Sequence, residues 1–169
     1  MRPGRGYVSP RFFIGCRIMT KKPTAIIGVG NYLMSDEGVG IHAIAKLRTM
    51  NWSDDIDIID GGTPGVALLH MIEGRKLVVI IDCADFEAKP GEISIFNAAD
   101  LKRDTNDEIS LHATDLLGAL ELAKHAGSYP EKVIIVGIQP EHIGMGTSLS
   151  TSVEESLNEI PKTLKDIIL

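Results

Sequence analysis

Residues 28–40, GVGNYLMSDEGVG, decide how the first third of this chain folds. They follow the short apolar run at residues 25–27 and precede a helical pattern, so they predict a strand, a glycine turn and a helix start. Open α/β sheets bind ligands in the crevice at the carboxyl ends of their strands, which is where this turn belongs. The turn carries two adjacent acids, Asp36 and Glu37, which would repel a phosphate and attract a cation. The pattern therefore favours a metal site.

Strand and helix patterns alternate along the rest of the chain. Buried strands are predicted at residues 24–30, 77–81 and 132–138, and a further strand at 56–60. A short alternating strand at 92–96 is expected at an edge. Helices are predicted at 37–50, 64–73, 114–126 and 153–168. This order predicts a three-layer α/β fold, with a mostly parallel sheet of about five strands and helices on both faces.

The charge is distributed unevenly along the chain. Residues 1–22 hold six basic residues and no acid, whereas the remainder holds 11 basic and 23 acidic residues, a net charge of −12. An acidic body argues against nucleic-acid binding, and no run approaches the roughly 18 apolar residues of a membrane span. We expect residues 1–22 to be a disordered extension or a mis-assigned start, with translation beginning at Met19, and residues 23–169 to form one α/β domain. Two cysteines give no disulfide or zinc spacing, which favours a cytoplasmic protein.

A further carboxylate follows the third strand. Helix capping would explain one of Asp36 and Glu37, but Asp82 ends a five-residue apolar run, where a charge is costly unless it is paired or bound to metal. The first and third strands of such sheets are commonly neighbours, so Glu37 and Asp82 are expected to face one crevice. Either His112 or His142 could complete a metal site there, since both lie at element junctions on the same edge.

Other kinds of site fit the sequence less well. A dinucleotide fingerprint fails because Leu33 stands at its third glycine position, and a receiver domain needs a lysine where this chain has Gln139. The metalloprotease motif HExxH and the hydrolase motif GxSxG are both absent from the sequence. Cys83 follows a buried strand, which favours an inert small hydrophobe over a nucleophile.

Five segments together resemble the NiFe-hydrogenase maturation endopeptidases. They occur in the family's order and extend over the chain after residue 23: GVGNYLMSDEGVG at 28–40, IDGGTPG at 59–65, VVIIDCAD at 78–85, ISLHATDLL at 109–117 and VIIVGIQPE at 133–141. By this resemblance Glu37, Asp82 and His112 are the catalytic and metal-contacting residues, and His142 becomes a second choice. The segment 60–63 lies where the family has an adaptable loop that helps to distinguish substrates. The substrate-recognition residues implied are Asp60, Gly61, Gly62 and Thr63.

The resemblance also implies a function. The family removes a C-terminal extension from the precursor of the hydrogenase large subunit after nickel has been inserted. Nickel would then come with the substrate, and this nickel-dependent endopeptidase, of aspartic or metallo type, would hold no tightly bound metal at rest. The nickel, or a water on it, could polarise the scissile carbonyl or supply hydroxide, with one carboxylate as base.

Two other functions are compatible with the sequence. A noncatalytic chaperone could use the same crevice to hold the nickel-loaded subunit, and would leave the mass of the subunit unchanged. A nucleotide-binding α/β module would be stabilised against heat by NAD or ATP.

Overall fold

The computed structural model describes residues 21–63, 65–101, 110–111 and 114–168. Most of the predicted N-terminal extension lies outside these ranges, and so does His112. None of the helices within them is long and apolar enough to cross a membrane.

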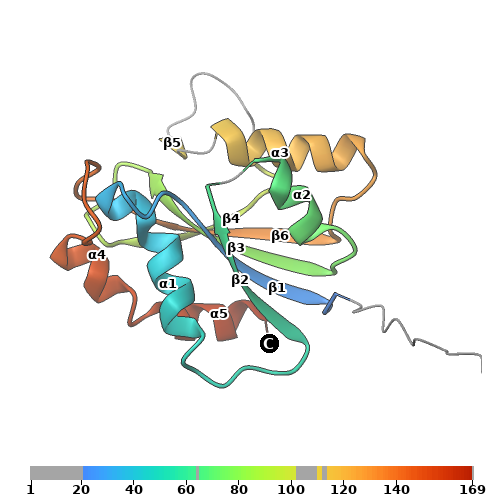
Figure 1. The fold of residues 1–169 in the computed structure, drawn as a ribbon, viewed down its shortest axis with the longest axis horizontal. Coiled ribbons are helices and arrows are strands. Elements are labelled where there is room, and N and C mark those ends of the chain that lie inside the picture. Colours follow the sequence, from blue (N-terminus) through green and yellow to red (C-terminus); the bar gives the residue numbers. More distant parts are fainter. Residues whose placement is uncertain (1–20, 64, 102–109, 112–113, 169) are drawn as a thin grey trace, which may run out of the picture.

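The centre of the molecule is a sheet of five strands in the order β2-β1-β3-β6-β4, shown in Figure 1. Their bounds are β1 Thr24–Val29, β2 Ile56–Gly62, β3 Leu77–Asp85, β6 Lys132–Ile138 and β4 Ile93–Asn97. All neighbours are parallel except β4, which runs antiparallel to β6 at the edge. A short sixth strand, β5 (Ser110–Leu111), pairs with the end of β3. The mostly parallel sheet and the edge strand are therefore as predicted.

Helices cover both faces of this sheet. On one face lie α2 (Val66–Ile72) and α3 (Thr114–His125), and on the other lie α1 (Val39–Leu47), α4 (Thr151–Ser156) and α5 (Ile160–Ile168) (Figure 1). Strands covered on both faces bury every side chain, which explains the continuous apolar runs in the sequence. The predicted three-layer α/β architecture is confirmed.

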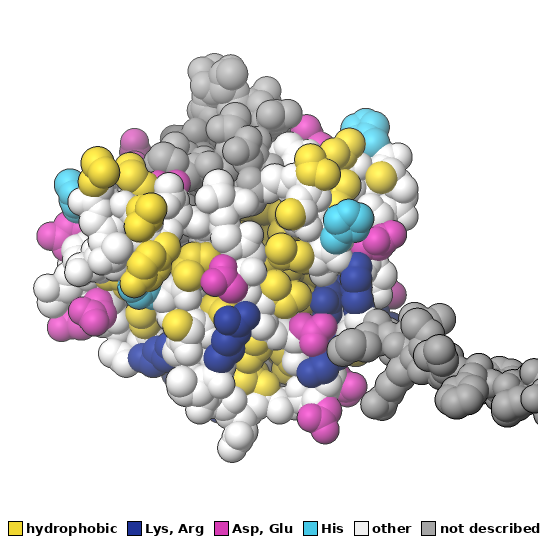
Figure 2. Space-filling view, viewed as in Figure 1, with side chains coloured by type: hydrophobic (Ala, Val, Ile, Leu, Met, Phe, Trp, Pro, Cys, Tyr) yellow, Lys and Arg dark blue, Asp and Glu magenta, His cyan; other side chains and the backbone are white. Residues whose placement is uncertain are grey.

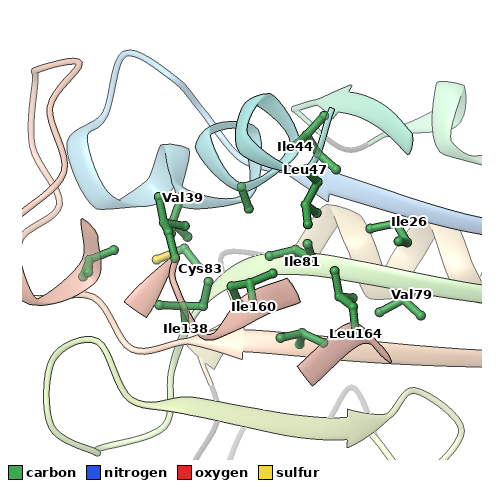
Figure 3. Packing of buried hydrophobic residues seen from close by; sticks show 14 of the residues in the cluster. Ile26, Val39, Ile44, Leu47, Val79, Ile81, Cys83, Ile138, Ile160 and Leu164 are labelled. Atoms are coloured by element: carbon green, nitrogen blue, oxygen red, sulfur yellow. The ribbon is translucent and has the colours of Figure 1, made fainter. Parts of the chain in front are cut away.

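Cys83 belongs to the core beneath α1. Figure 3 shows its side chain between Val39 of α1 and Ile138 of β6, and it is 1% exposed. Burial raises the pKa of the thiol, so the group stays neutral and unreactive. The interpretation of Cys83 as an inert small hydrophobe agrees with this environment.

The start of α1 packs directly against the sheet because residue 40 is a glycine. A Cβ atom added to Gly40 would lie 2.2 Å from the carbonyl oxygen of Val29 and 2.4 Å from that of Ile81. Only glycine therefore allows the helix to approach β1 and β3 this closely. The 3-10 helix η1 (Ser35–Gly38), which carries Glu37, comes immediately before α1 and packs against β3. The predicted helix 37–50 is thus two elements, η1 and α1.

Two strands continue further than predicted. β3 does not end at Asp82 but reaches Asp85, because β6 pairs with it beyond the point where β1 stops and β5 then pairs with its last residues. β2 likewise continues to Gly62, with an irregularity in its pairing with β1 between Gly28 and Val29. Asp82 therefore lies inside a strand.

The predicted closing helix at residues 153–168 is wrong in one respect. It is divided into α4 and α5, which are separated by a turn at residues 157–159. Pro161 stands in the first turn of α5, where its missing N–H is tolerated, and it disfavours a helix that continues unbroken through it.

Candidate functional site

Asp82 is a buried carboxylate near the carboxyl end of β3. It is 3% exposed, and its Oδ1 accepts a hydrogen bond of 2.8 Å from the backbone N–H of Cys83. Burial raises the pKa of Asp82 to about 7, the bond from Cys83 opposes this rise, and the negative charge of Glu37 adds to it. The structure therefore brings Glu37 and Asp82 close enough for their charges to interact, as the crevice hypothesis requires.

This pair of carboxylates has the chemistry of a cation site. Two negative charges in a buried setting repel each other, and a cation between them would stabilise both ionised forms. Among the described residues, no group of three His, Cys, Asp or Glu side chains is placed to hold a metal ion. The predicted third ligand, His112, lies outside those residues, so its distance to the pair is not described.

Asp36 has a structural role that the sequence did not predict. It is fully buried, and its carboxylate accepts backbone hydrogen bonds from Glu141 (2.9 Å), His142 (2.8 Å) and Ser150 (2.7 Å) as well as one from the Ser150 hydroxyl. The capping interpretation is wrong, since neither η1 nor α1 has a side-chain cap bond. Asp36 instead fixes both ends of the loop between β6 and α4 to the segment that carries Glu37.

We expect Asp36→Asn to destabilise the protein by about 2 to 3 kcal/mol, because an amide would present a donor to groups that are themselves donors. Burial alone would raise the pKa of Asp36, but the bonds from Ser150, His142 and Glu141 outweigh it and lower the pKa. The wild type should therefore lose this stabilisation as the pH falls below about 4. Urea unfolding at pH 7 measures the change, and Glu141→Gln, an exposed change in the same loop, should shift the midpoint little. Equal midpoints for Asp36→Asn and wild type would contradict the clamp.

Two of the histidines that the structure describes, His142 and His42, make contacts of other kinds. His142 engages Asp36 with its backbone N–H, and its exposed ring lies against Gly144. The ring of His42 stacks on Tyr32 with centroids 5.1 Å apart.

The segment 60–63 and the carboxylate pair both lie at the carboxyl ends of the strands. Asp60 pairs in register with Gly28, and its Oδ1 accepts a hydrogen bond of 3.0 Å from the N–H of Gly62. Gly62 has a φ of +55° and its carbonyl accepts a bond from Gly30, so the segment borders the turn that leads to Glu37. Gly62 serves the turn geometry, whereas a Cβ atom added to Gly61 would lie 2.8 Å from the side chain of Ile27, and Thr63 is exposed.

A second polar residue missed by the sequence interpretation is Gln139. Its side chain is buried, accepts hydrogen bonds from the N–H groups of Phe86 and Ala88, and donates one of 2.9 Å to Asp85. These bonds tie the loop after β3 to the end of β6. The sequence signal for this role was a glutamine directly after an apolar strand, because a buried polar side chain needs hydrogen-bond partners.

Comparison with known proteins decides the family. The family model described as "Hydrogenase maturation protease" (HycI) matches residues 41–167, which is more than half of the chain. The chain belongs to the hydrogenase maturation protease family. The match includes Asp82 and the segment 60–63, while Glu37 lies just before it.

Relatives of this family member span several bacteria. The hydrogenase expression/formation protein HoxM of Azotobacter vinelandii is 31% identical over 142 residues, 82% of this chain and 69% of the relative. The hydrogenase 2 maturation protease of Escherichia coli K12 is 29% identical over 147 residues, 83% of this chain and 90% of the relative. Among solved structures, the hydrogenase maturating endopeptidase HybD from E. coli has a TM-score of 0.69 at 26% identity, covering 86% of this chain and 93% of that one.

Several curated relatives are longer than this chain, which spans only part of their length. This hydrogenase maturation protease family member spans 58% to 69% of the length of four bacterial hydrogenase expression/formation proteins.

Proposed function

We propose that this protein is an endopeptidase that removes the C-terminal extension of a NiFe-hydrogenase large-subunit precursor once nickel has been inserted. The observation that carries the proposal is the interaction between the charges of Glu37 and Asp82. The two residues lie at the carboxyl ends of the strands, in a chain of this family. E. coli relatives named as a hydrogenase 2 maturation protease and a maturating endopeptidase support the activity.

In this proposal the metal arrives with the substrate. Nickel held by the precursor would contact Glu37, Asp82 and His112, and it would displace the proton that Asp82 retains up to about pH 7. The nickel polarises the scissile carbonyl, and one of the two carboxylates accepts the proton of the attacking water. The segment 60–63 borders this site and would contact the precursor backbone.

Intact-mass spectrometry of a large-subunit precursor tests the proposal. The precursor is incubated with the protein in two forms, one nickel-loaded and one nickel-free. We expect loss of a C-terminal peptide from the loaded form alone. An unchanged mass in both forms, with loading verified, would overturn the peptidase proposal in favour of a chaperone that holds the loaded subunit.

We expect Glu37→Gln to lower the kcat for loaded precursor about 100-fold, because the amide can neither accept a proton nor match the charge of the metal. Glu92→Gln makes the same chemical change at an exposed position at the start of β4 and should leave kcat unchanged. Single-turnover kinetics with excess enzyme measure the rate of cleavage apart from product release. Full activity of Glu37→Gln would remove Glu37 from the mechanism.

A further inference from the structure

Two loops at the carboxyl ends of the strands are joined by backbone hydrogen bonds. The segment before η1 and the loop before α4 form a parallel bridge between Met34 and Gly146. The N–H of Gly146 donates to the carbonyl of Leu33 at 3.0 Å, and the N–H of Ser35 donates to the carbonyl of Gly146 at 2.8 Å. Leu33 and Met145 each directly precede a bridged residue, so this pairing brings their backbones close together.

This pairing gathers large apolar side chains in solvent. Leu33 is 64% exposed and Met145 is 94% exposed, and next to them Tyr32 is 48% exposed. We call these three residues the apolar rim. Figure 2 shows hydrophobic side chains gathered at the upper left, the end of the molecule where these two loops lie in Figure 1. Single exposed hydrophobic residues are ordinary, but a group of them marks an interaction site.

The backbone beneath the apolar rim is held firmly. The side chain of Asn31 accepts a hydrogen bond from the N–H of Leu33, and the ring of Tyr32 stacks on His42. The loop that carries Met145 is fixed at both ends by the carboxylate of Asp36. A connecting loop needs no such support, whereas a binding surface gains affinity when its groups are already ordered.

Charge and position indicate what the apolar rim contacts. Residues 31–35 and 143–150 contain no charged side chain, so nothing in them selects a nucleic acid or a charged peptide. The rim is continuous with the candidate site, because η1 begins at Ser35 and carries Glu37. Three partly exposed side chains also offer much less than the roughly 800 Å² per partner of a stable interface, which disfavours a second copy of the chain.

We propose that the apolar rim is a docking surface for an apolar polypeptide segment of the precursor next to its nickel site. The inference rests on the proposed function for the identity of the partner. The rim binds polypeptide and not metal, so it sets affinity for the precursor, while the carboxylate pair acts on the scissile bond.

The double variant Leu33→Gln/Met145→Gln tests this division of roles. We expect its KM for loaded precursor to rise about tenfold, with kcat within twofold of wild type. Calorimetry should show a similarly raised Kd for nickel-free precursor, which carries the same segment. The matched control is Leu122→Gln on α3, a side chain of 48% exposure that faces solvent elsewhere, and it should behave as wild type in both assays.

The outcomes separate this inference from the proposed function. Cleavage by wild type with unchanged KM and Kd in the double variant would overturn the docking surface and leave the peptidase intact. Precursor binding that depends on the rim, without cleavage, would support the surface and overturn the peptidase. A wild-type dimer that becomes monomeric in the double variant, with precursor binding unchanged, would identify a second copy as the occupant and overturn the proposal.

Discussion

Replacing Asp82 with asparagine should stop precursor processing and yet stabilise the folded protein at neutral pH. Asparagine fits the same space, and its carbonyl can still accept the hydrogen bond from Cys83. The substitution removes a buried carboxyl group. Burial raises the pKa of this group from 3.8 to about 7, and the charge of Glu37 adds to the rise. A shift of about three units corresponds to about 4 kcal/mol, which we take as the upper limit of the gain.

The stabilisation by Asp82→Asn should depend on pH in a defined direction. The folded protein keeps a proton on Asp82 up to about pH 7, whereas the unfolded chain loses it near 3.8. The contribution of Asp82 to the free energy of unfolding of the wild type therefore falls as the pH rises from about 4 to about 7. Urea unfolding at pH 5.5 and pH 8 should show a larger advantage of Asp82→Asn at pH 8.

Processing by Asp82→Asn should fall about 1,000-fold or more, since the amide cannot offer a negative charge to the metal. The control is Asp85→Asn, three residues along the same strand. A hydrogen bond from Gln139 lowers the pKa of Asp85, so this variant should gain no stability and should keep its activity. Lower stability of Asp82→Asn at pH 8, or retained processing, would contradict the buried-charge account.

The second large effect is expected at Gly40, where α1 meets β1 and β3. In Gly40→Ala the new Cβ would lie 2.2 Å from the carbonyl oxygen of Val29 and 2.4 Å from that of Ile81. Both contacts are with backbone, which cannot rotate away as a side chain can. We expect a loss of about 3 kcal/mol or more, well above the roughly 1 kcal/mol that alanine gains over glycine inside a helix.

Gly40→Ala should also disturb the site. The helix can relieve the clash only by moving away from the sheet, and η1 with Glu37 precedes it directly. Thermal unfolding measures the stability, and a rise in KM for loaded precursor measures the displacement. Gly65→Ala is the control for stability, because no described residue other than its chain neighbours has an atom within 4 Å of its added Cβ and its φ of 170° suits alanine. Equal melting temperatures for the two variants would show that α1 is not held by this contact.

The layers of the fold, and the end of the sheet at which chemistry is expected, follow from the sequence alone. Apolar runs such as Leu77–Ile81 indicate a strand that is buried on both faces. The alternation of apolar and polar residues around Ile93–Phe96 indicates an edge strand. These are local patterns, set by which faces of an element meet solvent. The acids expected near the carboxyl ends of the first and third strands were also visible, and their meeting follows from the parallel order of the sheet.

The roles of the individual polar groups depend on the assembled tertiary structure. Asp36 and Glu37 are adjacent in sequence, yet Asp36 binds a loop more than 100 residues away while Glu37 acts on Asp82. The extension of β3 past Asp82 and the bridge between Met34 and Gly146 likewise depend on partners distant in the chain. Periodicity reports which side of an element is buried. It carries no information on which distant donor satisfies a buried carboxylate, because that is fixed only when the whole sheet has assembled.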